Sequence, residues 1–235
     1  PPETRPTLLQ ETLFMQVSRI RALRGPNLWS RHTAMEAIVT CTPEGSGLSA
    51  QHLIEQQLRR IFPEVGPFDG QRPGEAATLA HALEKVTLSL QIHAGCPVSF
   101  SRTTPTEEPG VFQVVVQYTE EAVGRLALEL ATQLCQAAIQ GIGFDLEAAM
   151  AQLHELDEDV RLGPSTGAIT DAAVARGIPI RRLTPGSLVQ LGWGAQQRRI
   201  QAAETDTTSA IAESIAQDKD LTKRLLHAAG VPVPT

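Results

Sequence analysis

The sequence predicts a mixed α/β protein of the α+β kind, in which a largely antiparallel sheet carries packed helices. Apolar residues form 42% of the chain, which is enough for a packed core. Some apolar runs have the length of strands and end at turn residues, whereas elsewhere apolar residues recur at helical spacing. Consecutive strands joined by short loops usually pair antiparallel, and we expect that pairing here.

The first part of the chain contains both kinds of pattern. Strands are expected at 16–23, 34–41, 98–100 and 111–118, the last two paired across a polar loop at 101–110. A first helix is expected to be capped by Ser49 and to stop at Pro63, within a loop at 62–74. Further helices are expected around Leu79–Leu90, at 120–140 and at about 146–156.

Beyond Gly163 the elements become shorter. Helices are expected at 166–176, 207–217 and 220–229, with strands at 178–183 and 197–203. This alternation predicts a small α/β layer. We therefore divide the chain into a loosely ordered tail at 1–15, a first domain at 16–160 and a second at 161–235, with a linker near 157–162.

Charge and composition argue against several classes of protein. The net charge of −6 disfavours nucleic acid as a main partner. Nine basic and six acidic residues lie from Arg161 onward, so that part carries +3 and the first 160 residues carry −9. No apolar run reaches the roughly 18 residues of a membrane helix, and the start lacks a secretory pattern. We expect a cytoplasmic protein with no membrane partner.

The three cysteines point to no special chemistry. Cys41, Cys96 and Cys135 are widely spaced, odd in number and form no CxxC pair. Neither a zinc knuckle nor a disulfide framework is indicated. We expect buried thiols in a reducing compartment.

Two stretches of the sequence are distinctive. Residues 23–30 read Leu-Arg-Gly-Pro-Asn-Leu-Trp-Ser, and a longer pattern begins with Leu-Gly-Pro-Ser-Thr at 162–166. The longer pattern continues with Gln-Leu-Gly-Trp-Gly at 190–194, Gln-Arg-Arg at 197–199, Asp-Lys at 218–219 and Gly-Val-Pro-Val-Pro at 230–234. In order and spacing the sequence resembles the cyanophycin synthetases, and Pro-Gly-Val-Phe-Gln-Val-Val at 109–115 fits the same family.

Enzymes of this family are ATP-dependent ligases that build a polymer of aspartate with arginine on each side chain. The resemblance implies an N-terminal polymer-binding domain, an ATP-grasp domain that adds aspartate and a Mur-ligase-like domain that adds arginine. It places the beginning of the ATP-grasp module at 161–235. The full-length parent would then use ATP, Mg²⁺, aspartate, arginine and a polymer primer, and form a homo-oligomer.

For this chain the resemblance implies polymer binding, no complete catalytic site and no tightly bound cofactor. It also implies roles for individual residues. Lys219 would contact ATP phosphate, where a compact cation offsets developing charge; the alternative is a surface lysine at a helix start. Arg102 would contact polymer, or be an ordinary loop arginine.

Ser165 and Thr166 follow Gly-Pro at the start of an expected helix, where backbone N–H groups favour an anion. The resemblance implies that they meet the C-terminal carboxylate of the polymer; the alternative is that one of them caps the helix. Arg198 and Arg199 are candidates for bidentate bonds to phosphate or carboxylate. If the two arginines lie in a strand, only one of them can face a given cleft, because neighbours point to opposite faces. The alternative is that both are ordinary surface arginines.

His81, Glu84 and Lys85 form a degenerate metal motif. Many members of the family have His-x-x-Glu-His here, similar to the inverzincin signature of metallopeptidases, in which two histidines one helical turn apart hold zinc. Lys85 replaces the second histidine, and a protonated lysine has no lone pair for a metal. We therefore expect no metal site and no zinc hydrolase activity, and we expect His81 and Glu84 to be an exposed helical pair.

Two other functions stay open. One is a metallohydrolase-like domain that generates primers, which Lys85 disfavours. The other is a different ATP-grasp ligase of the glutathione-synthetase type, which the stretch from Asp218 to Pro234 alone allows. Under the polymer-binding hypothesis, the carboxylates of Asp157, Glu158 and Asp159 steer an arginine-rich polymer; otherwise they form a solvated face or linker.

Overall fold

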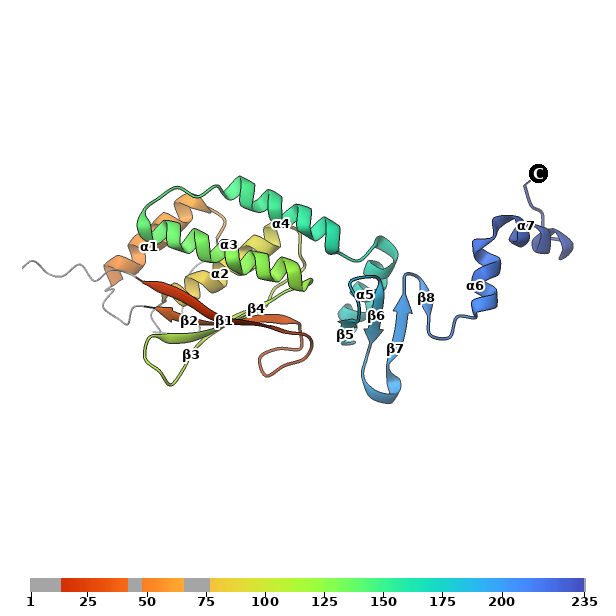
Figure 1. Cartoon of the computed structure of the whole chain (residues 1–235), viewed down its shortest axis with the longest axis horizontal. Helices are drawn as coiled ribbons and strands as arrows, with labels where there is room; N and C mark the ends of the chain where they lie inside the picture. The colour runs from red at the N-terminus through yellow and green to blue at the C-terminus, as the bar shows by residue number, and fades with distance from the viewer. Residues whose placement is uncertain (1–13, 42–47, 66–76, 235) are drawn as a thin grey trace, which may run out of the picture. The chain divides into compact units, whose positions relative to one another are not determined.

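The computed structural model describes residues 14–41, 48–65 and 77–234 of the 235-residue chain, with the side chains of 48–53 left aside. The chain divides into two compact units, with the boundary between Arg161 and Leu162. Each unit is considered by itself (Figure 1). Within the described residues, no helix is both long enough and apolar enough to cross a membrane.

The first unit is a four-stranded antiparallel sheet with helices on one face (Figure 1). The strands are β1 (Met15–Leu23), β2 (Ala34–Cys41), β3 (Ser101–Pro105) and β4 (Val111–Gln117), in the order β1-β2-β4-β3. The helices are α1 (Leu48–Ile61), α2 (Leu79–His93), α3 (Glu121–Gln140) and α4 (Leu146–Val160). Helix α2 packs against the sheet and α3, and α4 packs on α3.

The core of this unit lies between the sheet and its helices. Ala37 and Val39 of β2 and Val114 and Val116 of β4 face the helices, because alternate residues of a strand point to the same side. Leucines of the helices fill the other side of the core and are almost fully buried: Leu58, Leu83, Leu90, Leu128, Leu134 and Leu153. The few aromatic residues of the chain leave aliphatic side chains to supply most of this buried area.

A β-bulge in β1 decides which residues of that strand face outward. The pairing with β2 shifts between Ser18 and Ile20, and Arg19 has a positive φ of 38°. Met15 and Val17 face the helices before the bulge, whereas Ile20 and Ala22 pair with helix-facing residues after it. An extra residue in one strand changes the side that later residues face. Arg21 therefore lies on the open face of the sheet.

The second unit contains α5 (Pro164–Ala175), a four-stranded antiparallel sheet and two C-terminal helices. The strands follow one another in sequence order and are β5 (Ile180–Arg182), β6 (Leu188–Leu191), β7 (Arg198–Gln201) and β8 (Glu204–Thr205). A 3₁₀ helix (Gly194–Gln196) precedes β7, and α6 (Ala210–Gln217) and α7 (Lys219–Ala228) follow β8. The described side chains buried here are few: Thr166, Thr170, Ala173, Val189, Gln190 and Ile200.

The mixed α/β fold with antiparallel sheets is confirmed, but several local predictions are wrong. The strand predicted at 98–100 lies at Ser101–Pro105, inside the predicted polar loop, because Thr103 takes a buried place on the sheet. Helix α4 continues to Val160, so Asp157 begins no linker. Strands β5 to β8 form a meander without α-helices between them, which contradicts the βα alternation. The side chain of Ser49, the tail at 1–13 and the loop at 66–74 lie outside the described residues.

A close contact of α3 at Gly124 predicts an effect of mutation. A Cβ at Gly124 would lie 2.7 Å from Tyr118 Cβ and 3.3 Å from Met35 Cγ. We expect Gly124→Ala to lower the free energy of unfolding by about 1–3 kcal/mol, since overpacking outweighs the helix propensity of alanine. Gly143→Ala is the control, because a Cβ there meets nothing within 4 Å. Urea unfolding measures both, and equal stability of the two variants contradicts the packing argument.

Candidate functional site

His81 and Glu84 lie inside the protein, which corrects the expectation of an exposed pair. Their exposed fractions are 1% and 0%. The expectation was wrong because α2 contacts α3, α4 and three strands, so the side of the helix that carries both residues has no access to solvent. The degenerate metal motif is therefore part of a buried polar cluster between α2 and β3.

The hydrogen bonds of this cluster occupy its acceptors. Glu84 accepts from Ser101 Oγ at 2.6 Å, Thr103 Oγ1 at 2.5 Å and Lys85 Nζ at 3.1 Å. His81 Nδ1 lies 2.9 Å from Thr78 Oγ1 and accepts from the Thr78 backbone N–H at 3.2 Å. Buried charges are stable only with such partners. The hydrogen bonds of Glu84 to Ser101 and Thr103 therefore connect α2 to β3.

These residues do not fit a zinc ion. The ammonium of Lys85 occupies one oxygen of Glu84, and it brings positive charge to the place where a second histidine would bind a dication. Both oxygens of Glu84 also receive hydroxyl donors, so the carboxylate is not available to activate water. In the part of the chain that the structure describes, no three His, Cys, Asp or Glu side chains are grouped to hold a metal.

A second polar cluster lies on the open face of the first sheet. Cross-strand pairing places Arg21, Glu36, Val115 and Arg102 in one row across all four strands. Glu36 is only 2% exposed and accepts from Arg21 Nε and Nη2 and from Gln113 Nε2. Burial raises the pKa of the Glu36 carboxyl, but these hydrogen bonds and the charge of Arg21 outweigh it and hold the pKa below its ordinary value.

Arg102 ends this row beside an aromatic ring. Its guanidinium carbon lies 5.7 Å from the ring centroid of Trp29, which belongs to the loop between β1 and β2. Asn27 holds that loop in shape, since its side chain donates to the carbonyls of Gly25 and His32 and accepts from the N–H groups of Trp29 and Ser30. The sequence analysis named Arg102 as a candidate polymer contact. It did not name Arg21, Glu36 or Trp29, because only the bulge and the loop bring them together.

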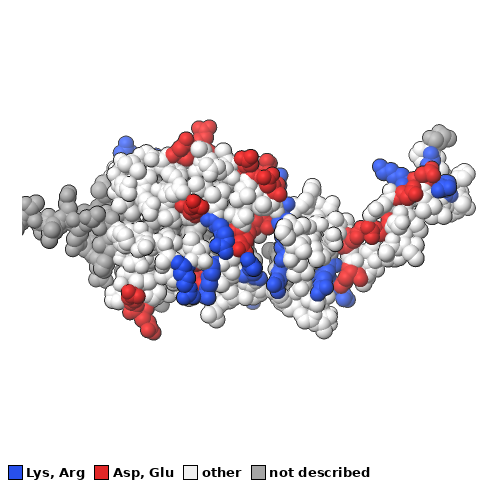
Figure 2. Space-filling view, viewed as in Figure 1, with Lys and Arg blue, Asp and Glu red and all other residues white. Residues whose placement is uncertain are grey.

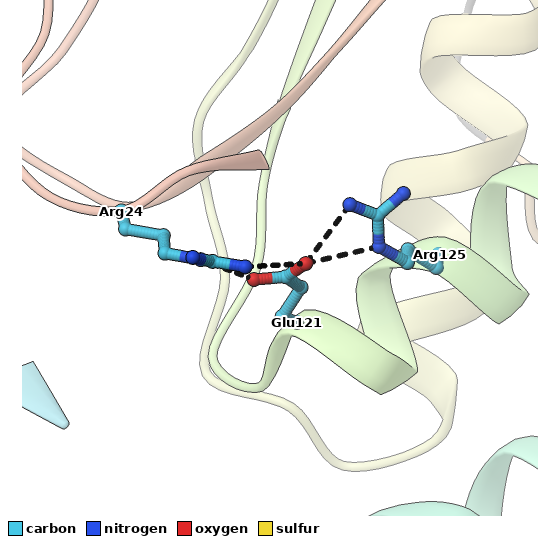
Figure 3. Close-up of polar contacts among 3 residues, drawn as sticks. All are labelled: Arg24, Glu121 and Arg125. Carbon is cyan, nitrogen blue, oxygen red and sulfur yellow. Dashed lines mark hydrogen bonds and ion pairs between the residues drawn. The ribbon is translucent and has the colours of Figure 1, made fainter. Parts of the chain in front are cut away.

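The start of the same loop is tied to α3. Figure 3 shows the Glu121 carboxylate between the guanidinium groups of Arg24 and Arg125. Arg24 Nε donates at 2.7 Å, and Arg125 donates through Nε at 3.0 Å and Nη2 at 2.9 Å. Hydrogen bonding from Arg24, more than that from Arg125, lowers the pKa of Glu121 against the opposing effect of burial. This shared carboxylate fixes where the loop leaves β1.

The acidic end of α4 borders a hollow. A space of about 450 Å³ lies between the C-terminal end of α2 and one side of α4. Its carboxylates are Glu147, Glu155 and Glu158. Of the predicted steering residues, Glu158 lines the hollow, Asp159 is exposed, and Asp157 is half-buried and accepts from Cys96 Sγ at 3.6 Å.

The site residues predicted in the second unit lie on separate elements. Helix α5 begins at Pro164 with Gly163 as its N-cap, so neither Ser165 nor Thr166 caps it. Ser165 is exposed, whereas Thr166 is buried and donates to the Ala202 carbonyl at 3.1 Å. Arg198 and Arg199 are neighbours in β7, so they point to opposite faces, and both are exposed.

Lys219 is the first residue of α7 and is exposed. It lines a hollow of about 240 Å³ together with Thr222 and Lys223. Asp218 precedes it and caps α7 by accepting from the Leu221 N–H at 2.9 Å. The hollow therefore carries two cations at the start of a helix, an arrangement that suits an anionic group.

The buried Glu84 predicts unequal costs for two neighbouring substitutions. Glu84→Ala leaves the hydroxyls of the buried Thr103 and the half-buried Ser101 without their acceptor and creates a cavity. We expect it to lower the free energy of unfolding by about 3 kcal/mol. Lys85→Ala removes a partly exposed partner and should cost less than about 1 kcal/mol. Urea unfolding monitored by circular dichroism measures both. Equal losses would show that the hydroxyl donors do not depend on Glu84.

The cysteines predict low reactivity in the folded chain. Cys41, Cys96 and Cys135 are buried and free, as the sequence predicted. Burial raises the pKa of the Cys41 and Cys135 thiols to about 12 and that of Cys96 to about 11. Since the thiolate is the reactive form, we expect a disulfide reagent at pH 8 to label none of the three rapidly in the native chain and all three in denaturant. Rapid native labelling contradicts this burial.

Comparisons with known proteins agree with the sequence patterns. The family described as "Cyanophycin synthase-like N-terminal domain" matches residues 64–140. The chain is 37% identical to the cyanophycin synthetases of Trichormus variabilis and of a Nostoc species, and 33% identical to that of a Synechocystis species. Each alignment covers 94% of this chain but only 26% or 27% of the relative, so the chain spans about a quarter of their length. This chain is homologous to the N-terminal region of the cyanophycin synthetases.

Proposed function

We propose that this chain is the polymer-holding N-terminal part of an ATP-dependent amide ligase that extends multi-L-arginyl-poly-L-aspartate, and that by itself it binds polymer without catalysing ligation. The observation that carries the proposal is the identity of 37% over 94% of the chain, which includes both compact units. A single shared motif would not account for similarity of that extent. The related enzymes are named cyanophycin synthetases.

In the parent enzyme, ATP, Mg²⁺, aspartate and arginine are the small-molecule partners. The second unit begins the ATP-grasp module in this proposal. Lys219 and Lys223 line one hollow, and as compact cations they suit phosphate oxygens. A nucleotide needs a larger enclosed space than the hollow of about 240 Å³ beside them. These lysines would therefore supply one wall of a nucleotide site.

Ser165, Arg198 and Arg199 are exposed in the same unit and remain proposed contacts for the polymer end. Thr166 is a weaker candidate, because its hydroxyl is used inside the unit by the Ala202 carbonyl.

A metallohydrolase function is not favoured by the buried cluster. Lys85 stands where the second zinc ligand would be, and Glu84 is committed to three donors. A glutathione-synthetase-like ligase accounts for part of the second unit only. The relatives align with the first unit as well, which supports the polymer ligase instead.

The first unit offers carboxylates to an arginine-bearing polymer. Glu147 and Glu155 lie eight residues apart on α4, which corresponds to about 12 Å along the helix, and Glu158 lies one turn beyond Glu155. Guanidinium groups pair well with carboxylates, and an acidic surface attracts them over a distance of about 10 Å in dilute salt. We propose that this side of α4 receives arginine side chains.

Calorimetry with short β-aspartyl-arginine oligomers tests the proposal. We expect the wild-type chain to bind, and Glu155→Gln with Glu158→Gln to weaken binding about tenfold at low salt, with less effect at high salt. The matched control is Glu107→Gln with Glu108→Gln, an equal charge change in the exposed turn between β3 and β4. Absence of binding by the wild type rejects the polymer-holding function. Equal binding by both double variants rejects the role of α4. Stoichiometric zinc in the purified chain would instead favour the metallohydrolase.

A further inference from the structure

The open face of the first sheet carries more positive than negative charge. Among the described residues, Arg21 and Arg102 share their cross-strand row with one carboxylate, that of Glu36, whose pKa Arg21 and Arg19 both lower. Figure 2 shows Lys and Arg side chains gathered over one part of the lower side of this unit, where Figure 1 places the strands, with some Asp and Glu beside them and more Asp and Glu along the helical side. The strand side of the first unit therefore carries a group of cations.

Glu36 does not neutralise this face toward solvent. It is 2% exposed, and its oxygens receive Arg21 and Gln113. The carboxylate stays ionised because its pKa is lowered, and it fixes Arg21 through Nε and Nη2. The side chain of Arg21 is still 51% exposed. Glu36 thus orients one face of the Arg21 guanidinium and leaves its outer side to solvent.

Arg102 presents a second guanidinium in a different way. It is exposed and lies over the ring of Trp29 at 5.7 Å. Stacking on an aromatic ring orients a guanidinium and leaves the N–H groups in its plane to meet other acceptors. Among the described residues, no carboxylate forms a salt bridge with Arg102. The sheet therefore holds an oriented cation whose charge is not balanced by a neighbour.

The spacing of these two arginines suits a ligand with repeated anionic groups. Arg21 and Arg102 lie at opposite ends of one cross-strand row, with Glu36 and Val115 between them. Three strand spacings separate their backbones by about 14 Å. An extended chain lying across the strands would meet both cations, whereas a single small anion would meet one.

The chemistry of arginyl-polyaspartate supplies such groups. The side chain of aspartate ends in a carboxyl group, so arginine is joined to it by an amide to the arginine amino group. Each arginine then keeps its own carboxylate as well as its guanidinium. The polymer therefore presents negative charge at every repeat, although arginine is usually considered for its positive charge. Carboxylates match the forked N–H donors of arginine in bidentate pairs.

We propose that the open face of the first sheet, with Arg102 on Trp29 and Arg21 on Glu36, binds the free carboxylates of the arginine side chains of the polymer. This inference rests on the proposed polymer-holding function and assigns the carboxylates to a surface other than α4. The helical side takes guanidinium groups and the sheet side takes carboxylates. A zwitterionic polymer is thereby distinguished from a simple polycation.

The test uses two synthetic probes and the whole chain. One is a β-aspartyl-arginine oligomer with free arginine carboxylates, and the other is the same oligomer with each arginine as its amide. We expect the amide oligomer to bind wild type at least tenfold more weakly. Arg102→Ala and Arg21→Ala should each weaken binding of the free oligomer about tenfold and leave binding of the amide oligomer unchanged. Arg59→Ala, on α1, is the control for losing an exposed arginine.

Two further measurements make the outcome decisive. Arg102→Lys keeps the charge but loses the fork and should fall between wild type and Arg102→Ala. In a Trp193→Phe background, Trp29 is the only tryptophan, and the free oligomer should change its fluorescence while the amide oligomer should not. Circular dichroism confirms that each variant is folded.

Equal affinity of the two oligomers for the wild type would overturn this inference and leave the proposed function intact. Binding of the free oligomer at wild-type strength by both folded alanine variants would do the same. If the wild type binds neither oligomer, the proposed function itself fails, and this inference fails with it.

Discussion

Helix α2 packs against α3, α4 and three strands of the first sheet, and ten of its fifteen residues are buried. A helix with so little access to solvent must either be apolar throughout or satisfy each polar group inside the protein. In this chain the buried carboxylate of Glu84 is satisfied inside the protein, by hydrogen bonds from Ser101 and Thr103 of β3 and from Lys85. The position of β3 in the sheet therefore depends on a carboxylate of α2, and the sheet and helices form one cooperative unit.

The same sheet has a different character on its other face, because a bulge separates the two halves of β1. Had the alternation continued through Arg19, Arg21 would point toward the helices, where a guanidinium has no place. The bulge moves Arg21 to the open face and leaves Ile20 and Ala22 in register with β2. The polar row on the open face and the apolar core under it thus depend on the same extra residue.

The sequence predicts most helices and the central strands because their apolar patterns are long and regular. It fails at β3, where the strand is Ser-Arg-Thr-Thr-Pro and its buried face is made of hydroxyls that need Glu84 as a partner. It also fails for His81 and Glu84, because spacing along a helix gives their common face but not what covers it. In the second unit, β5 and β7 lie inside the strands predicted at 178–183 and 197–203, whereas β6 and β8 were not predicted, because strands of two to four residues carry little pattern.

On the open face, too, the sequence indicates single residues but not the contacts between them. Arg102 was predicted, whereas its partner Trp29 lies more than seventy positions earlier and reaches it only through the loop that Asn27 holds. Pairing across distant strands is a property of register, which local periodicity does not contain. Residue patterns therefore find the elements, and the tertiary contacts that join them decide which polar groups meet.

Asp218 contributes hydrogen bonds to two helices, α6 and α7. Its backbone N–H closes α6 by donating to the Ser214 carbonyl at 3.3 Å, and its side chain opens α7 by accepting from Leu221. Asp218 is thus both the C-cap of α6 and the N-cap of α7, and no linking residue lies between the two helices. Lengthening the chain here by a single residue would separate the two tasks and turn Lys219 to another direction around the helix axis. Length variation among related sequences is therefore expected in the turns of the β5–β8 meander rather than at this corner.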